Sequence, residues 1–456
     1  MSNGMVKERE KNSAKTWIIV ISSFFANGII FGIHNCFGIL YPWLRDEFAQ
    51  NNVDNPSAKA SFVGSLAVGM TFLSSPVAGI LTDKFGAKST ALLGAILAST
   101  GMLLSAYSLN KVEALYVTYG IMFGGGSSLA YNPSLVVLGH HFDKRLGLIN
   151  GIVTAGSSIF TVTLPFMLQY ILDRAGLVAT LQILSAVLAF LILSSIFYDI
   201  PYLEQKVESR VKIFNKDIWK SKLYIIWIIG VPLALVGYFV PYVHLVAFSE
   251  EVALKADGKW LVLCIGLTSG LGRLIFGQIA DMPNINRLLI QQFSILLIGS
   301  LTMLLTICRS FVCFIILCLC LGLADGCFVA LQGVIPFDIC GREGASQALG
   351  FALGIMAVPI SVGPPIAGAL RESLGSYKIP FILAGIPPII GSLFIFLGYG
   401  VISRKQGSNT VKNQEDFERR KSEDDEEKYK TSILQKDKNT NVNLTGYANE
   451  RPDNLW

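Results

Sequence analysis

Two side chains of opposite charge stand alone inside long apolar stretches of this sequence. Arg273 lies within residues 260–281, and Asp325 lies in "GLADGCF", within residues 311–335. A guanidinium can grip a carboxylate through two parallel hydrogen bonds, so Arg273 is suited to binding a carboxylate group. Asp325 can supply that group from within the chain, or both side chains can contact a bound ligand. A structural salt bridge and a ligand site are both open, and they are compatible with each other.

His34 and His244 are the only histidines inside the apolar stretches. A single histidine on a helix is usually a core residue with satisfied hydrogen bonds, which is the plainer interpretation. Because imidazole titrates near neutral pH and can donate or accept a hydrogen bond, the pair are also candidates for ligand contact. The eight cysteines lack metal-ligand spacing, so we expect them to pack as small apolar residues and predict no metal site.

The elements that must position these residues follow from the composition. Hydrophobic residues make up 52% of the 456 positions and charged residues only 15%, against about a quarter in soluble domains. A bilayer core about 30 Å thick needs roughly 20 apolar residues per helix. Stretches of that length predict an all-α membrane protein with twelve spans, at approximately residues 17–44, 60–82, 88–107, 113–138, 146–172, 177–198, 223–248, 260–281, 287–307, 311–335, 344–371 and 378–401.

Charge in the connections predicts the orientation, because Lys and Arg beside a span resist translocation. Basic residues precede the first span and recur in alternate connections, most densely in the connection 199–222. We therefore expect the N-terminus 1–16, the connection 199–222 and a disordered, charged tail 403–456 to lie in the cytoplasm. The connection separates a six-helix bundle at 17–198 from a second one at 223–402.

Each half carries a similar turn after its second span. "GILTDKFGAKS" at 79–89 and "GRLIFGQIADMPNINR" at 272–287 share a glycine, a hydrophobic pair, an aspartate and a basic residue. The matching positions indicate a parallel internal repeat, of the kind on which major facilitator transporters are built. A generic membrane turn is the alternative. Asp83 and Asp281 occupy corresponding places and are candidate gating residues.

The polar run "GHHFDKRLGLINGIVTAGSS" at 139–158 separates the fourth and fifth spans. Its charges suit the headgroup level, so His140 and His141 are expected in a loop. Small residues then recur at helical spacing, at Gly147, Gly151, Ala155 and Gly156. They form a face to which a neighbouring helix can approach closely.

This run also resembles the signature of monocarboxylate transporters, an aromatic residue and two basic residues before a glycine-rich helix that ends in Ala-Gly-Ser. The resemblance covers about residues 17–402. Several stretches are similar to the branch of that family that carries thyroid hormones and aromatic amino acids: "FGIHNCFGILY", "VPLALVGYFVPYVHL", "IGLTSGLGRLIFG", "GLADGCF" and "ISVGPPIAGALRESLGSY". This chain departs from the family pattern in one place. The family's cluster of acidic residues, glycine and tryptophan before the first span is reduced here to "SAKTW".

The resemblance implies a major facilitator fold and assigns roles to particular residues. It implies substrate contact for His34 and His244, both pairing and substrate contact for Arg273 and Asp325, and a need for Arg145 in transport. An aromatic substrate also needs apolar walls, which aromatic side chains on these spans can supply. The expected substrate site therefore includes Phe31, Tyr238 and Tyr242, together with Asn35.

Two positions predict whether transport is coupled to protons. Proton-coupled lactate carriers of the family resemble one another in a lysine on the first span and an aspartate one turn before the arginine of the eighth. This chain has Asn35 and Ser269 there, and neither side chain titrates. The resemblance together with these residues favours facilitated diffusion over proton symport.

We therefore expect an alternating-access uniporter for aromatic amino acids or iodothyronines in the plasma membrane. A proton-coupled monocarboxylate symporter is the alternative, and a non-transporting membrane sensor is an alternative of another class. An enzyme is not expected, because no nucleophile, base and orienting group fall together. The expected partners are a small-molecule substrate and the lipid bilayer, with no cofactor and no nucleic acid. An ancillary membrane subunit or a homodimer stays open.

Overall fold

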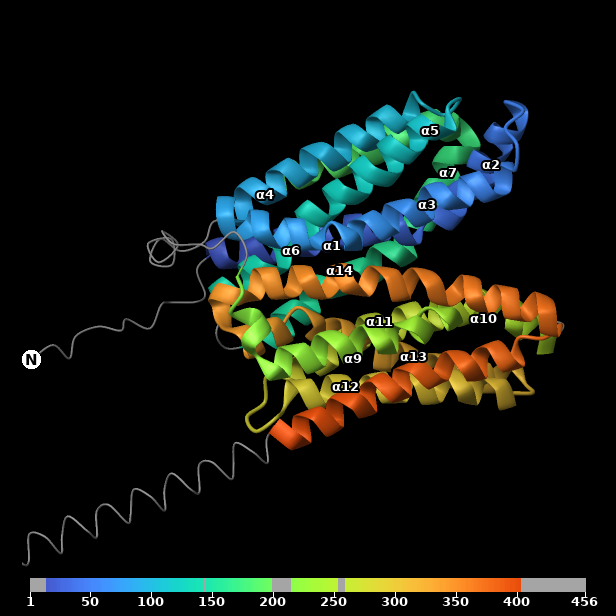
Figure 1. Cartoon of the computed structure of the whole chain (residues 1–456). Coiled ribbons are helices and arrows are strands. Elements are labelled where there is room, and N and C mark those ends of the chain that lie inside the picture. The colour runs from blue at the N-terminus through green and yellow to red at the C-terminus, as the bar shows by residue number, and fades with distance from the viewer. Residues whose placement is uncertain (1–13, 143–144, 199–214, 253–258, 403–456) are drawn as a thin grey trace, which may run out of the picture. The chain divides into compact units, whose positions relative to one another are not determined.

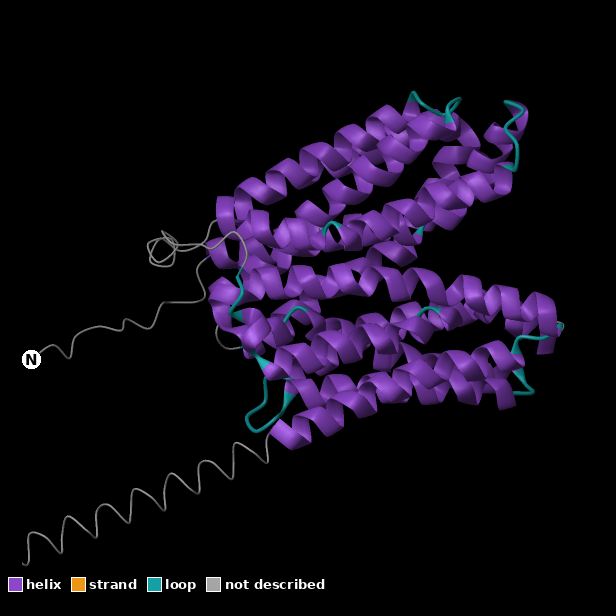
Figure 2. Cartoon of the chain, viewed as in Figure 1, coloured by secondary structure: helices purple, strands orange, loops and turns teal. Residues whose placement is uncertain are grey.

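The structure is a computed structural model that describes residues 14–142, 145–198, 215–252 and 259–402. Regular structure within these ranges is helical, without a strand (Figure 2). Contacts divide the chain into residues 1–397 and residues 398–456, and only 398–402, the end of the final helix, are described in the second unit. Most of the predicted N-terminus 1–16, most of the connection 199–222 and the predicted tail 403–456 lie outside the described residues.

The first half of the chain forms a bundle that runs from blue to green in Figure 1. Its elements are α1 (Ala14–Asn35), α2 (Phe37–Gln50), α3 (Pro56–Leu73), α4 (Ser75–Ala106), α5 (Val112–Leu115), the π-helix η1 (Tyr116–Phe123), α6 (Gly124–His141) and α7 (Leu146–Ser195). A straight helix of the 50 residues in α7 would be about 75 Å long, more than twice the bilayer core. Instead α7 turns at Gly176, whose φ of 76° strains any residue with a side chain. Gly86, with φ of 83°, turns α4 in the same way.

The second half forms the bundle coloured from green to red in Figure 1. Its elements are the short η3 (Ile218–Lys220), α9 (Lys222–Tyr238), α10 (Val240–Val252), α11 (Lys259–Ile279), α12 (Arg287–Leu304), η4 (Leu305–Ile307), α13 (Phe311–Gln332), α14 (Ile335–Leu374) and a final helix, Lys378–Ile402. Polar residues begin three of these helices, because the side-chain oxygens of Ser221, Asn286 and Ser310 each accept a first-turn N–H. Gly341, with φ of 69°, turns α14.

The prediction of an all-α membrane fold is confirmed, and each of the twelve predicted spans coincides with helical backbone. Eight described helices are long and apolar enough to cross a membrane, and two of them, 146–195 and 311–371, each hold two predicted spans. Large apolar side chains cover the outer surface; Phe166, for example, is 76% exposed. In lipid such surfaces are stable, and helices satisfy their own backbone hydrogen bonds.

Two details of the sequence-based prediction are wrong. His140 and His141 belong to the last turn of α6 and not to a loop, and the ring of His141 bonds the carbonyl of Val137 at 3.0 Å. A histidine near a helix C-terminus can bond a carbonyl of the last turns, which lets the helix continue. Helical backbone likewise continues from the first span through α2 to Gln50, beyond the predicted limit at residue 44.

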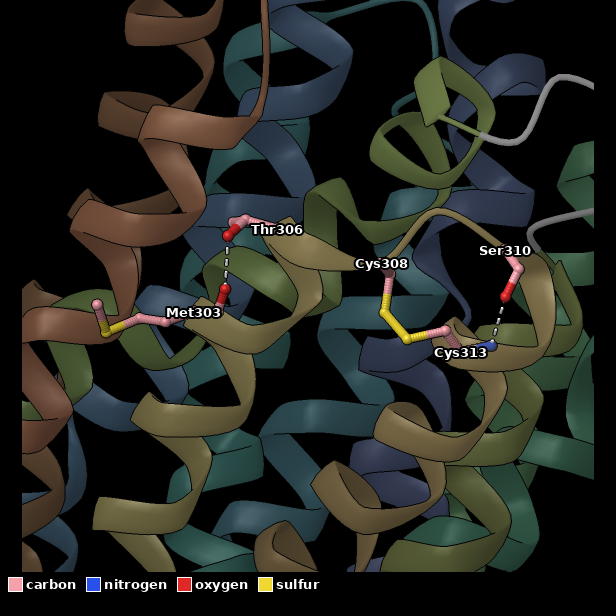
Figure 3. Close-up of a disulfide and its surroundings, with 5 residues drawn as sticks. All are labelled: Met303, Thr306, Cys308, Ser310 and Cys313. Carbon is pink, nitrogen blue, oxygen red and sulfur yellow. Dashed lines mark hydrogen bonds between the residues drawn. A yellow bond between two sulfur atoms is a disulfide. The ribbon is translucent and has the colours of Figure 1, made fainter.

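The cysteine prediction is wrong for two of the eight residues. Cys308 and Cys313 form a disulfide between the end of η4 and the first turn of α13 (Figure 3). Their Cα atoms are 5.6 Å apart because the intervening turn reverses the chain, and the hydroxyl of Ser310 accepts the Cys313 N–H inside it. Apolar surroundings therefore did not decide the state of this pair; the tight turn did.

Where the two halves meet, helix backbones lie so close together that only small residues fit between them. A methyl group on Gly147 would lie 2.6 Å from the carbonyl of Gly277, and Gly151 packs against the carbonyl of Arg273. The predicted small face of α7 is thus confirmed at these two positions, and its neighbour is α11. A second contact joins α4 to α14, where a methyl group on Gly79 would lie 2.7 Å from the carbonyl of Ser346. Gly79 and Gly277 lie four residues before Asp83 and Asp281, in the two similar turns of the sequence.

Candidate functional site

Asp325 lies inside α13 and is 5% exposed. Its Oδ1 accepts a hydrogen bond from the hydroxyl of Tyr238, at the end of α9, and its Oδ2 accepts one from Ser269 of α11 at 2.5 Å. Arg273 Nη2 is 4.0 Å from Oδ2. The predicted pair of charges is therefore present but loose, and two hydroxyl groups are the close partners of the carboxylate.

Glycines on α13 explain how α11 comes so near. Gly322 faces the carbonyl of Ile265, and Gly326 faces the backbone N–H of Arg273, each with no room for a methyl group. In "GLADG" the two glycines flank Asp325 at positions −3 and +1. Close packing of the two helices therefore places the Asp325 carboxylate beside the Ser269 hydroxyl, one turn before Arg273.

Arg273 connects the two halves of the protein. Its Nη1 donates hydrogen bonds to the carbonyl of Thr154 and the hydroxyl of Ser157, both on α7. Its Nε is buried and has no hydrogen-bond partner among the residues that the structure describes. A buried donor without a partner costs roughly 1–3 kcal/mol, so this edge of the guanidinium is an unsatisfied binding group.

Aromatic side chains surround the same carboxylate. The rings of Tyr238 and Tyr242 lie 5.4 Å apart, and Phe328 of α13 lies 5.4 Å from Tyr238. The Tyr242 hydroxyl is buried and interacts with Tyr238 and Asp325. This part of the site combines an apolar wall with buried hydroxyl groups.

The first half contributes a separate aromatic cluster on α1, α3 and α6. The rings of Phe31 and Tyr131 lie 4.9 Å apart, and Phe72 lies 6.1 Å from Phe31. His34 is 8% exposed; its Nε2 shares a hydrogen bond of 3.0 Å with Thr71. Tyr131 lies within electrostatic range of Arg273, so the cluster borders the charged site.

Two predicted site residues have their described contacts elsewhere. His244 Nε2 bonds the carbonyl of Pro364 at 2.9 Å, and its ring lies 5.4 Å from Tyr377, so its neighbours belong to the second half. The amide of Asn35 donates to Thr161 of α7 at 2.9 Å. The structure thus joins Arg273, Asp325, Tyr238 and Tyr242, and gives His244 and Asn35 other partners.

The predicted gating residue Asp281 binds the start of α7. Its Oδ1 accepts the N–H of Gly147 at 2.9 Å, and its Oδ2 accepts the N–H of Leu148 at 2.7 Å. Arg287 bridges Asp281 at 2.9 Å and Asp338 at 2.8 Å. A carboxylate at a helix N-terminus is stabilising because it satisfies free N–H groups and opposes the positive end of the helix dipole.

The conformation of Arg145 explains why the carboxylate that caps α7 comes from the second half of the chain. It precedes α7 with φ of 63°, a left-handed conformation, and its side chain forms no cap hydrogen bond. The first N–H groups of α7 therefore depend on Asp281. Asp83, in the similar turn of the first half, lies in α4 three residues before the turn at Gly86.

Sequence reasoning missed three groups that shape the site. Ser269 was recognised only for lacking a carboxylate, whereas its hydroxyl binds Asp325; its spacing of four residues from Arg273 was the available signal. Thr154 and Ser157 carried no signal, because the helix that faces them is more than 100 residues away. Among the described residues, no cluster of three His, Cys, Asp or Glu side chains could hold a metal ion.

Comparisons with known proteins agree with this architecture. The family described as "Major Facilitator Superfamily" matches residues 17–362. Monocarboxylate transporter 10 of Danio rerio is 43% identical over 436 residues, which cover 91% of this chain and 86% of the relative. Monocarboxylate transporter 10 of Homo sapiens is 42% identical over 408 residues, covering 86% and 79%. Monocarboxylate transporter 12 of Xenopus laevis is 28% identical, covering 84% and 88%.

Solved structures share the fold at low sequence identity. A crystal structure of the E. coli fucose:proton symporter superimposes with a TM-score of 0.66 at 13% identity, covering 84% of this chain and 99% of that one. The human organic anion transporter MFSD10 gives 0.64 at 13% identity, covering 84% and 100%.

Proposed function

Because the chain belongs to the monocarboxylate transporter family of the major facilitator superfamily, we propose that it is a facilitative uniporter for aromatic amino acids or iodothyronines. The buried guanidinium of Arg273 carries the proposal. It lies where α7 and α11 meet, and its Nε finds no hydrogen-bond partner in the described ranges of the chain. Such a group suits the carboxylate that both substrate classes contain.

Aromatic side chains from both halves support the substrate class. Tyr238, Tyr242 and Phe328 belong to the second half, and Tyr131 and Phe31 belong to the first. Aromatic rings attract one another edge-on or offset, so these walls favour a substrate with a ring beside its carboxylate. We further propose substrate contact for His34, and an outer contact for His244 near Tyr377.

Transport would proceed by alternating access of two six-helix halves, 17–198 and 223–402, in the plasma membrane with both termini cytoplasmic. The α7–α11 and α4–α14 contacts and the Asp281 cap lie at the ends of helices on the predicted cytoplasmic side. Substrate passage to that side would require these contacts to separate. Asp281, Asp83 and Arg145 are the proposed gating residues.

Proton symport remains the second candidate because of one observation. Asp325 is a buried carboxylate beside a cation 4.0 Å away, and an ionisable group within a membrane can carry a proton. Uniport is favoured because Asn35 and Ser269 stand where proton-coupled carriers of the family resemble one another in a lysine and an aspartate, and the Ser269 hydroxyl instead donates to Asp325.

Uptake into proteoliposomes tests the proposal. We expect a labelled aromatic amino acid or iodothyronine to equilibrate across the membrane without accumulating, whether or not a proton gradient is imposed or sodium is replaced. An Arg273→Gln variant reconstituted at equal density serves as the negative control. Uphill accumulation driven by protons would establish symport, and no uptake above the control would support a membrane sensor.

A further inference from the structure

We propose that Thr154 and Ser157 of α7 are positioning residues, which turn the Arg273 guanidinium so that its Nε–Nη2 edge faces the substrate carboxylate. This inference rests on the proposed function, in which Arg273 binds that carboxylate. Neither α7 residue was expected in the site, and each acts through Arg273.

The hydrogen bonds define the orientation. Nη1 is bonded to both α7 acceptors, the carbonyl of Thr154 and the hydroxyl of Ser157. The Ser157 hydroxyl in turn donates to the Thr154 carbonyl at 2.9 Å, so its own proton points away and a lone pair is left for the guanidinium. Ser157 is 7% exposed and Thr154 2%, so water does not compete for these acceptors.

The opposite edge of the guanidinium is the one left for a ligand. Within the described part of the chain Nε has no hydrogen-bond partner, and Nη2 pairs with Asp325 Oδ2 at 4.0 Å. A guanidinium is planar, so fixing Nη1 also fixes the direction of the Nε–Nη2 edge. A carboxylate can bind that edge with two parallel hydrogen bonds.

The arrangement ties affinity to conformation. Arg273 belongs to α11 and the two acceptors belong to α7, and these helices pack closely through Gly151 and Gly147. When the halves part at this level, Nη1 loses both acceptors and the guanidinium is free to rotate. Affinity for the carboxylate should then fall, which would favour substrate release on the side that opens.

The test compares a carboxylate with its neutral counterpart. Competition for uptake is measured in proteoliposomes with an aromatic amino acid and with its carboxamide, for the wild type, Ser157→Ala, Ser157→Thr and Ser185→Ala. Ser185 is a matched control, because its buried hydroxyl also donates to a backbone carbonyl, that of Ser99 on α4 at 2.8 Å, but from the part of α7 beyond the turn at Gly176.

We expect Ser157→Ala to weaken competition by the acid about three- to tenfold, the effect of losing one hydrogen bond. Competition by the carboxamide should stay unchanged, Ser157→Thr should restore the wild-type value, and Ser185→Ala should have no effect. Equal weakening of acid and carboxamide would reduce Ser157 to a packing residue and overturn the inference. If the wild type itself fails to distinguish acid from carboxamide, the proposed reading of the carboxylate by Arg273 fails instead.

Discussion

Asp325 is a buried carboxylate whose close partners are hydroxyl groups and not a cation. Tyr238 and Ser269 each donate to one of its oxygens, and Arg273 stands 4.0 Å away because its Nη1 is bonded to α7. Buried polar groups are stable only when they are hydrogen-bonded. The hydroxyls therefore satisfy the two carboxylate oxygens of Asp325, while the guanidinium bonds α7 of the other half.

Replacing Tyr238 tests this account. Tyr238→Phe removes the donor to Oδ1 and leaves that oxygen buried without it, at a cost of about 1–3 kcal/mol. We expect a clear loss of thermal stability in the purified protein. Tyr119→Phe is the matched control, because the Tyr119 hydroxyl is buried and has no hydrogen-bond partner among the described residues. Thermal unfolding of the two variants in detergent is the measurement, and equal losses would contradict the assignment.

At the scale of elements, the disulfide that was not predicted lies in a turn between two helices. The turn between η4 and α13 is closed by the Cys308–Cys313 disulfide, on the side predicted to be extracellular. Disulfides persist in oxidising surroundings, which agrees with the predicted orientation. The other six cysteines of the chain are free, and Cys36, Cys318 and Cys327 are buried.

This orientation predicts the outcome of thiol labelling on intact cells. An impermeant maleimide should label the wild-type protein more strongly after an impermeant reductant has opened the disulfide. Cys308→Ser should leave Cys313, the more exposed partner, reactive without reductant. Unchanged labelling after reduction would mean that this turn faces the cytoplasm or that the thiols are not joined.

At the scale of the whole molecule, the two halves are joined by a cap that one half supplies to the other. Asp281 satisfies the N–H groups of Gly147 and Leu148, while Arg287 balances its charge and reaches Asp338. Opening this side would expose those N–H groups and separate the glycine contacts. The cap therefore stabilises the arrangement in which α7 and α11 are together.

Removing the cap should shift the conformational equilibrium. Asp281→Ala deletes two hydrogen bonds to a charged acceptor and should raise the open fraction about tenfold or more. The measurement is labelling, from the predicted cytoplasmic side, of a cysteine introduced by Ser346→Cys, a site buried where α14 meets α4, with the native cysteines replaced. Asp338→Asn is the control, because it weakens only the outer ion pair. Equal labelling in both variants would assign the effect to charge balance and not to the cap.

The sequence by itself determined the membrane fold and the position of the charges. Continuous apolar stretches are required to cross a bilayer, and each helix satisfies its own backbone, so the spans could be located without knowledge of their neighbours. Arg273 and Asp325 stood out because a charge within a span is costly. The glycines of α7 were recognisable for a similar reason, since their helical spacing is local.

The tertiary structure alone decided which polar groups meet. Ser157 reaches Arg273, and Asp281 reaches Gly147, across more than 100 residues of chain. His244 is turned toward Pro364. These pairings depend on the rotation and tilt of each helix, which are set by side-chain packing against distant helices and have no periodic signature along the chain. The cap on α7 had to come from elsewhere because Arg145, in a left-handed conformation, forms no cap hydrogen bond of its own.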